Sequence, residues 1–435
     1  MNAGIRQIRT AAEQGIADMF AAIKGELPGD ATERQRAFDV FAGAGLPHRR
    51  IEAWKYTDLR AAMRAAKPLA STAQAALSQG RSADLLAHIE ARRLVFGNGR
   101  MIESLSDLAD IEPGLTIETF DSVLGRDAAA LAGDALAPAN DDAAVALNTA
   151  FTRDGVVIRV AEGATLRRPL HLLFTVQGEA AAVYSRVVID VGAGAKLALI
   201  ETHESAAGRD DQINMAIDLV VGDRAHVDHV KFGLESENTL HVASWGMRLG
   251  AASHLNTFIL NVGGGLVRNQ IFAECQGDAA TLRFGGVNLL TGRQHADTTL
   301  TLNHVAPGCQ SRELFKSVLD GRSRGVFQGR ISVQPQAQKT DARMMTRALL
   351  LSEDAEADMK PELEIFADDV QCGHGATAGA LDDNLKFYLM ARGLPEKEAE
   401  SLLIQAFIGD AVETVEDAGL REVLMLLAVE WLEAR

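Results

Sequence analysis

Glycines recur along the middle of the chain at a nearly constant interval, and this spacing constrains the fold more than any other feature. Gly163, Gly178, Gly192, Gly208 and Gly222 follow one another in nearly equal steps. After a double interval to position 250, the series resumes at positions 264, 277, 292, 308 and 321. Short β-branched runs, such as those at 156–160 and 187–191, precede several of these glycines. The interval is too short for a βαβ unit, which needs about 30 residues.

Two architectures suit strands at this interval, a β-solenoid with stacked coils and an antiparallel β-sandwich. The interval persists for about eleven steps, which is more than the seven to nine strands of a sandwich use. Several runs are apolar on both faces, as strands enclosed in a parallel coil are. The chain has no strict hexapeptide repeat. The periodicity therefore favours the solenoid and leaves the sandwich as the alternative.

The regions on either side of the strands are predicted to be helical. Residues 1–145 are expected to form a helical N-terminal domain, because apolar side chains near its start recur at three- and four-residue steps. A short strand at 94–96 is an open alternative, and residues 134–142, which contain Pro138 and Asn140, are the expected linker. Residues 146–340 form the predicted core. Residues 341–435 are expected to begin with a short β or loop segment and then to form a helical partner-binding domain.

Charge and cysteine content exclude several classes of function. The net charge of −16 argues against nucleic acid and anionic membranes as partners, because both require a basic surface. Neither the start of the chain nor any later apolar run has the length of a secretory signal or a membrane span. The three cysteines are far apart and form no Cys-x-x-Cys motif, so a disulfide framework is not expected. The protein is predicted to be cytoplasmic.

Cys372 and His374 form the most distinctive chemical pair in the chain. They are two residues apart and flanked by glycines. In an extended segment they would share one face, and both are ligands that hold iron, zinc or copper. Zinc and iron–sulfur centres use about four ligands, so the pair alone would be an incomplete site. The alternative is a small buried cysteine beside a hydrogen-bonded histidine.

Several segments that are collinear along the chain resemble one known family. The segments are Pro47-His48-Arg49-Arg50-Ile51-Glu52-Ala53-Trp54-Lys55-Tyr56-Thr57, Ala337-Gln338-Lys339-Thr340-Asp341, Leu349-Leu350-Leu351-Ser352, Pro361-Glu362-Leu363-Glu364-Ile365-Phe366-Ala367-Asp368-Asp369-Val370, Cys372-Gly373-His374-Gly375-Ala376-Thr377, Phe387-Tyr388-Leu389 and Arg392-Gly393-Leu394. Together they resemble the SufB/SufD family, the scaffold subunits of the SUF iron–sulfur cluster assembly machinery. The Cys-x-His-Gly-Ala-Thr form is similar to the SufD branch of that family.

The resemblance implies a right-handed parallel β-helix core flanked by helical N- and C-terminal domains. It implies a complex with a SufB-like sister subunit and a SufC-like ATPase, and leaves open whether the isolated chain forms a homodimer. By the same resemblance, His374, together with Cys372, would contribute to a transient iron–sulfur cluster site shared with the sister subunit. The ATPase would dock on the C-terminal helices, where Phe387, Leu403 and Phe407 are candidate contacts. Packing within the chain's own core is the alternative for the stripe that contains Leu403 and Phe407.

Other motifs carry weaker signals. His226 and His229 are three residues apart on a predicted strand, so they should face opposite ways and not converge. His304 with Cys309 could suggest metal ligands by residue type, but both are expected to be structural or solvent-facing residues. Cys275 is expected to be a small core residue. A Gly-x-Ser-x-Gly match at 321–325 lies between strands rather than before a helix, which argues against a hydrolase.

Three functions remain in view. The absence of a Gly-x-x-x-x-Gly-Lys-Ser/Thr loop predicts that the chain binds no nucleotide. A non-catalytic assembly scaffold is the preferred function. The alternatives are a polysaccharide-acting β-helix enzyme and a metal-free structural adaptor. The role of Arg49, Arg50, Trp54, Lys55 and Tyr56 is left open between gripping a partner or anion and anchoring the helices on the core.

Overall fold

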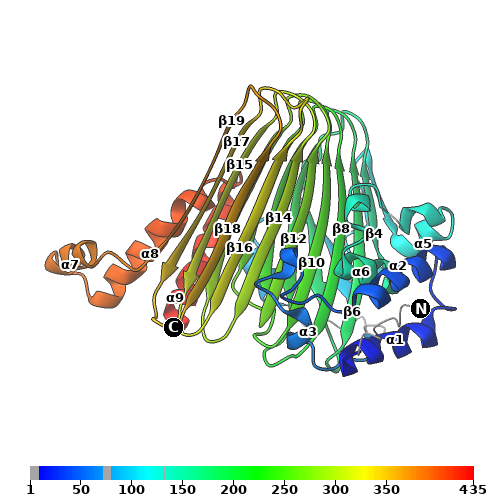
Figure 1. Cartoon of the computed structure of the whole chain (residues 1–435), viewed down its shortest axis with the longest axis horizontal. Coiled ribbons are helices and arrows are strands. Elements are labelled where there is room, and N and C mark those ends of the chain that lie inside the picture. Colours follow the sequence, from blue (N-terminus) through cyan, green and yellow to red (C-terminus); the bar gives the residue numbers. More distant parts are fainter. Residues whose placement is uncertain (1–8, 72–79, 132) are drawn as a thin grey trace, which may run out of the picture.

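The centre of the molecule is a parallel β-solenoid made of two facing sheets (Figure 1). The computed structural model describes residues 9–71, 80–131 and 133–435. Sheet A has nine strands, which are β3 (Leu115–Thr119), β4 (Asp154–Val160), β6 (Ala182–Val191), β8 (Gln212–Val221), β10 (Leu240–Leu249), β12 (Leu266–Cys275), β14 (His295–His304), β16 (Arg324–Val333) and β18 (Glu356–Ile365). Sheet B has ten strands, which are β1 (Arg92–Gly97), β2 (Arg100–Met101), β5 (Leu170–Thr175), β7 (Lys196–Glu204), β9 (His226–Leu234), β11 (His254–Asn261), β13 (Thr281–Leu290), β15 (Gln310–Leu319), β17 (Asp341–Leu350) and β19 (Gln371–Gly379).

From β4 onward, consecutive strands alternate between the two sheets, and each strand pairs in parallel with the strand two positions later. The glycine interval is therefore half a coil, because a strand and the short turn that follows it make up each step. Gly321 adopts a φ of +64° in one such turn, which suits glycine. Gly277 lies so close to the coil below that a Cβ there would be 2.0 Å from the backbone nitrogen of Ala251. The solenoid prediction is confirmed, and the sandwich is not the fold.

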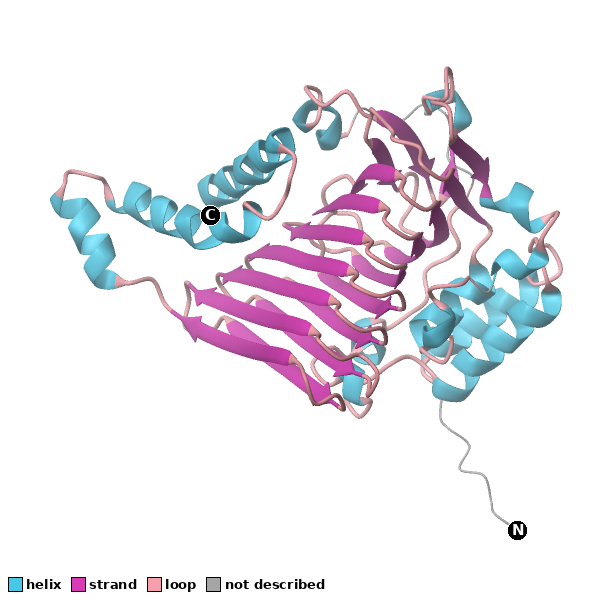
Figure 2. Ribbon diagram, turned by 90° about the horizontal axis from the view of Figure 1, so that it is seen from above, coloured by secondary structure: helices cyan, strands magenta, loops and turns pink. Residues whose placement is uncertain are grey.

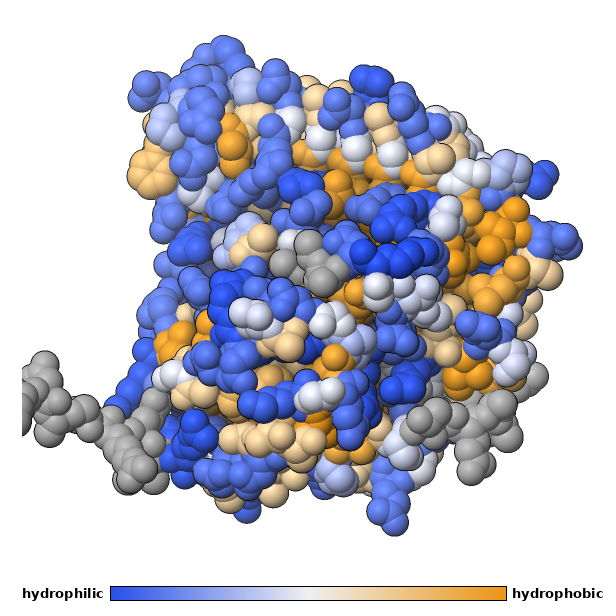
Figure 3. All heavy atoms as spheres, turned by 90° about the vertical axis from the view of Figure 1, so that its right-hand side faces the viewer, coloured by the Kyte–Doolittle hydropathy of each residue, from blue (hydrophilic) through white to orange (hydrophobic). Residues whose placement is uncertain are grey.

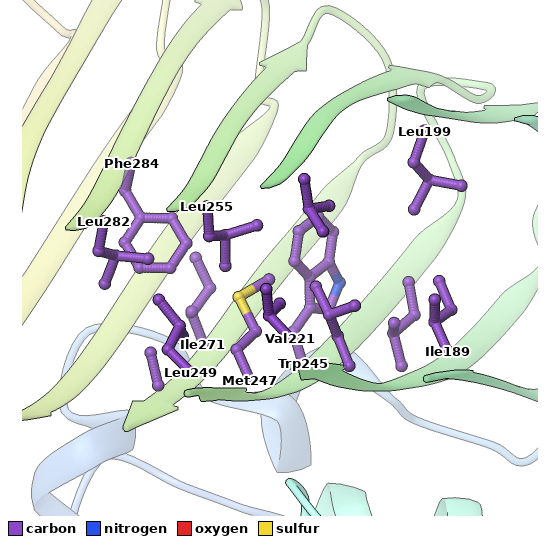
Figure 4. Close-up of a cluster of buried hydrophobic side chains, with 14 of the residues drawn as sticks. Ile189, Leu199, Val221, Trp245, Met247, Leu249, Leu255, Ile271, Leu282 and Phe284 are labelled. Atoms are coloured by element: carbon purple, nitrogen blue, oxygen red, sulfur yellow. The ribbon is translucent and has the colours of Figure 1, made fainter. Parts of the chain in front are cut away.

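The core of the solenoid lies between the two sheets, where inward side chains from successive coils stack in rows. Figure 4 shows Leu249 and Ile271 from sheet A meeting Leu255 and Phe284 from sheet B. Each of these side chains is almost completely buried. Every other residue of a strand points inward. Since strands of successive coils pair in parallel, an inward residue and its register partner in the next coil lie in the same row.

The N-terminal helices cover the outer face of sheet A (Figures 1 and 2). They are α1 (Ala11–Ile23), α2 (Ala31–Ala44), α3 (Leu59–Ala62) and α6 (Ala143–Phe151), with the short 3-10 helix η1 (Glu52–Trp54) between α2 and α3. The buried Trp54 ring lies under the guanidinium of Arg268 on β12, at 3.8 Å from its ring centroid. Arg49, Arg50 and Lys55 are exposed. Trp54 thus anchors this segment on the core, while the cations beside it face solvent.

The region before residue 145 is not wholly helical, which corrects the prediction for residues 1–145. It contributes β1, β2 and β3 to the solenoid, and β1 confirms the short strand considered at 94–96. The other helices in this part are α4 (Arg81–Leu85), α5 (Phe120–Leu124) and the 3-10 helices η2 (Glu103–Leu105), η3 (Ala128–Leu131) and η4 (Ala137–Ala139). Alanine-rich composition and the short length of these strands concealed them.

The N-terminal end of the solenoid is closed. At this end β2 and β3 pair antiparallel with β1 and β4, so the parallel coil is not continued. The buried Arg92 guanidinium donates to the carbonyls of Asp107, Ala109 and Asp110 at 2.6–2.8 Å, and Leu108 packs against the core. Figure 3 views this end, where hydrophilic side chains are interspersed with smaller hydrophobic patches.

The expected linker at 134–142 is packed against sheet A. The backbone N–H groups of Ala135 and Leu136 donate to the carboxylate of Asp218 on β8, at 3.1 and 3.0 Å. Gly246 on β10 lies beneath the segment, and a Cβ there would be 2.4 Å from its backbone. The segment crosses the sheet in close contact with it.

The solenoid strands continue beyond residue 340. β17, β18 and β19 extend both sheets to Gly379, so the first part of the 341–435 region is the last portion of the coil. The helices that follow are α7 (Asp383–Ala391), α8 (Glu396–Val412) and α9 (Ala418–Ala434). α8 and α9 pack on the outer face of sheet B through a cluster that includes Ile404, Ile408 and Leu427. Among the helices of the described residues, none is long and apolar enough to cross a membrane.

Candidate functional site

The C-terminal end of the solenoid is open. β18 and β19 are the last strands of their sheets, and within the described chain each pairs with a neighbour on one side only. Most of β19 is exposed, and β18 has no fully buried residue. Ile365, at the end of β18, and the adjacent Phe366 expose 42% and 59% of their surface. This end therefore presents unpaired backbone groups and apolar side chains together, which is the chemistry of an interface.

Cys372 and His374 lie on β19 and belong to the inward-facing rows. In the register of β17 and β19, Cys372 stands beside Ala342, and His374 stands beside Met344. Ala342 and Met344 are buried core residues. No further coil covers β19 within the described residues, so Cys372 is half-buried against the core and His374 is exposed. Burial raises the pKa of the Cys372 thiol above its ordinary value.

Glu313 on β15 lies in the same row as His374, two coils below it. The register pairs Glu313 with Met344, and Met344 with His374. The carboxylate is buried, and neither oxygen has a hydrogen-bond partner among the residues that the structure describes. Burial raises the pKa of Glu313 to about 8. Sequence reasoning missed this residue. The signal that could have found it is the spacing, because Glu313, Met344 and His374 follow one another at intervals close to one full coil.

Cys372 and His374 do not form a complete ligand set by themselves. Three groups of potential metal ligands cluster within the described part of the chain, and neither residue belongs to any of them. Zinc and iron–sulfur centres use about four ligands. An iron site on this edge strand would therefore need ligands from outside the chain.

The histidines expected to be structural have separate partners. The Nε2 atom of His226 lies 2.9 Å from Asp228 Oδ2, whereas His229 is buried and its Nε2 atom lies 3.2 Å from Glu201 Oε2. The prediction that His226 and His229 do not converge is confirmed. In contrast, His304 and Cys309, which were expected to be structural or solvent-facing, converge in a buried cluster with Cys275, which sequence reasoning had treated separately as a small core residue.

A buried charged network between the two sheets was also missed from the sequence. Lys231 and Glu201 face each other with Nζ and Oε1 3.8 Å apart, both essentially without exposure. Although burial acts to raise it, Lys231, His203 and His229 hold the pKa of Glu201 well below its usual range. Burial lowers the pKa of Lys231. The opposite charges of Lys231 and Glu201 compensate each other inside the coil. The sequence did not show this network, because most residues beside these two in their strands are apolar.

The three residues predicted to contact a partner have different surroundings. Phe387 on α7 exposes 72% of its surface. Leu403 and Phe407 are half-buried, and Lys316 Nζ lies 4.6 Å from the centroid of the Phe407 ring. The fully buried face of α8 is centred on Ile404 and Ile408 rather than on the predicted stripe. Figures 1 and 2 show α7 extending away from the solenoid.

Fold and edge strand together define a class of protein, a β-solenoid with a cysteine and a histidine on the last strand of an open end. Comparison with known families identifies the class more closely. A family model described as "SUF system FeS cluster assembly, SufBD core domain" matches residues 174–407. A second, described as "SufBD protein N-terminal region", matches residues 28–172.

Curated relatives match the chain over most of its length. The iron–sulfur cluster assembly protein SufD of Escherichia coli is 31% identical over 90% of this chain and 91% of its own. A SufBD family protein of Synechocystis is 31% identical over 89% of this chain and 88% of its own. A SufBD family protein of Mycobacterium tuberculosis is 26% identical over 95% of this chain and 94% of its own. The chain belongs to the SufB/SufD family of iron–sulfur cluster assembly proteins.

Proposed function

We propose that this chain is a non-catalytic scaffold subunit that lends His374 to an iron–sulfur cluster-building site shared with a SufB-like sister subunit. The observation that carries the proposal is the position of His374 and Cys372 on an exposed edge strand, with too few ligands for a cluster. The sister subunit would supply the missing ligands. The cluster is the cargo of this site and leaves it when assembly is finished.

The two side chains would contribute differently. His374 is exposed, so its imidazole can reach iron without a large desolvation cost. Cys372 is half-buried with a raised pKa, so it must lose a proton before it can ligate iron. His374 is therefore the principal ligand in the proposal, and Cys372 is the secondary one.

The sister subunit would dock on the open end of the solenoid. Unpaired backbone groups on β18 and β19 can pair with the edge strands of a second solenoid, as in other strand-addition interfaces. The exposed Ile365 and Phe366 would be buried in that contact. Docking would also cover the inward row that contains His374 and would enclose the shared site.

A SufC-like ATPase would supply the energy, since the sequence has no phosphate-binding loop. Phe387 is the strongest candidate for its docking site, because α7 also exposes Leu385, Tyr388 and Met390. Leu403 and Phe407 remain predicted contacts, although Phe407 also packs against Lys316. We expect the assembly to work in the cytoplasm.

The test is anaerobic affinity purification of the tagged chain from its own cells, with the co-purifying subunits identified and counted. We expect an ATPase with a Walker A loop and a second solenoid chain. Recovery of the chain alone, at native expression and low salt, would contradict the scaffold proposal.

The role of His374 is tested on the purified complex by reconstitution with iron and sulfide. His374→Ala should keep the subunits together and lose cluster formation. Thr377→Ala is the matched control, because Thr377 is exposed on the same strand but faces the opposite way. Full cluster formation by His374→Ala would instead favour a metal-free structural adaptor. The relatives are named as iron–sulfur cluster assembly proteins, which supports the scaffold over the polysaccharide enzyme considered from the sequence.

A further inference from the structure

We propose that Cys275, His304 and Cys309 form a second metal site, which binds one thiophilic divalent cation such as Zn²⁺ or Fe²⁺ inside the solenoid. The site is separate from the open end, because β16 lies between β14, which carries His304, and the edge strand β18 of sheet A. Its proposed role is to tie neighbouring coils together by binding only the folded chain.

The three residues converge from three different places in the coil. Cys275 is the last residue of β12, His304 is the last residue of β14, and Cys309 comes immediately before β15. Their ligand atoms, two sulfurs and one ring nitrogen, all lie within 4.8 Å of one another. A tetrahedral ion with ligands at about 2.0–2.3 Å holds these atoms about 3.5–3.8 Å apart. Closing the cluster on an ion therefore needs movements of no more than about 1 Å.

Register comparison shows that an imidazole is unusual at this position. Leu249, Cys275, His304 and Val333 follow one another in a single inward row of sheet A. The coils on either side of the cluster fill this row with Leu249 and Val333, both fully buried. A buried polar group in an apolar row costs free energy unless it is satisfied. Cys275 can be explained as a small core residue, but His304 cannot.

The hydrogen bonding of His304 leaves one ring nitrogen available. Its Nε2 atom lies 3.2 Å from Ser311 Oγ. Its Nδ1 atom is buried and has no hydrogen-bond partner among the described residues. When Nε2–H donates to Ser311, the lone pair is on Nδ1, which is the tautomer of a histidine ligand held by an outer partner. An orphaned buried acceptor is costly, and a bound cation would satisfy it.

Cys309 completes the set from sheet B. It precedes β15 at the register position that Ala280 holds in the coil before and Thr340 holds in the coil after. Its Sγ atom lies 3.3 Å from the carbonyl oxygen of Gly277, in a turn. Two thiolates and one imidazole suit zinc or ferrous iron, and they leave a fourth position for a water molecule or another small ligand.

The experiment uses the full chain, freed of metal and reduced with a phosphine under anaerobic conditions. Co²⁺ is titrated as an optical probe of thiolate ligation, and Zn²⁺ is tested for protection of thiols against a thiol reagent. We expect one Co²⁺ per chain with a sulfur-to-metal charge-transfer band. Saturating Zn²⁺ should protect two of the three thiols and raise the melting temperature by at least about 3 °C.

Three variants make the result specific. Cys372→Ala removes the only other cysteine and should leave the Co²⁺ band and its affinity unchanged. His304→Val and Cys309→Ala should each weaken binding by at least tenfold. His304→Val matches Val333 in the row, so the metal-free variant should be at least as stable as the metal-free parent. Loss of the band in Cys372→Ala, or parental affinity in His304→Val, would overturn the proposal.

Discussion

Arg268 joins the N-terminal helices to the solenoid, and its removal should loosen that attachment measurably. The side chain is fully buried and forms an ion pair with Asp297 on β14. Its Nε atom donates to Gln270 Oε1 at 3.0 Å, and its Nη2 atom donates to the carbonyl of Ala53 at 2.6 Å. The guanidinium also covers the ring of Trp54. One cation therefore links two strands of sheet A with the segment that leads into α3.

The expected cost follows from these contacts. Arg268→Met keeps most of the volume but leaves Asp297 buried without its ion partner, which typically costs about 3–5 kcal/mol. Loss of the contact with Trp54 adds up to about 2 kcal/mol. Hydroxyl groups of Thr57 and Thr299 still donate to the carboxylate and offset part of the loss. We therefore expect the free energy of unfolding to fall by about 3–5 kcal/mol.

The assay is urea denaturation of the purified chain, followed by tryptophan fluorescence. Arg283→Met is the matched control, because Arg283 is an exposed arginine on β13, and it should change stability by less than about 0.5 kcal/mol. Replacing Asp297 by Leu in the Arg268→Met background should recover at least half of the loss. A loss below about 1 kcal/mol for Arg268→Met would refute the reasoning.

Three further predictions concern packing, partner contact and pH. Gly246→Ala should destabilise the chain by about 1–3 kcal/mol in urea denaturation, because a Cβ would lie 2.4 Å from the backbone of the segment that crosses it. Gly409→Ala is the control and should not destabilise the chain, because Gly409 has open space around it. Ile404→Ala should lower the free energy of unfolding by about 2–5 kcal/mol, because the isoleucine side chain is fully buried. Phe387→Ala, in contrast, should leave the melting temperature unchanged and weaken ATPase binding in a pull-down. Burial lowers the pKa of His171 to about 3, so the unfolded chain binds an extra proton at that residue as the pH falls below about 6.5. Stability should therefore drop between pH 7 and 5, and His171→Gln should reduce that drop by about 1–2 kcal/mol in urea titrations at the two pH values.

The architecture could be predicted from the sequence because each half-coil repeats one physical unit. A strand and a glycine-containing turn fix the interval, and the alternation of the strands between two sheets follows from stacking the coils. The strands β1 to β3 break this rule, since they are short and two of their pairings are antiparallel. The buried face of α8 was also misjudged, because apolar residues surround the helix and only packing selects Ile404 and Ile408.

The sites depend on register, which turn lengths determine. Leu240 pairs with Leu266, and Cys275 pairs with His304, but the first pair is closer together in the sequence than the second. The difference comes from the lengths of the intervening turns, and an error of one residue moves a side chain to the opposite face. Cys372 and His374 could be paired from the sequence because they share one strand. The row that joins Glu313 to His374 required the coordinates.

The two ends of the solenoid differ in how readily a further chain could continue the coil. A parallel coil exposed at both ends could add subunits indefinitely and grow into a fibre, as head-to-tail contacts do. Here the antiparallel pairing of β2 and β3, together with the loop held by Arg92, interrupts the parallel coil at the N-terminal end. Continuation of the parallel coil by a further chain is therefore favoured at the C-terminal end over the N-terminal end. The asymmetry of the two ends thus disfavours open-ended head-to-tail growth of the coil.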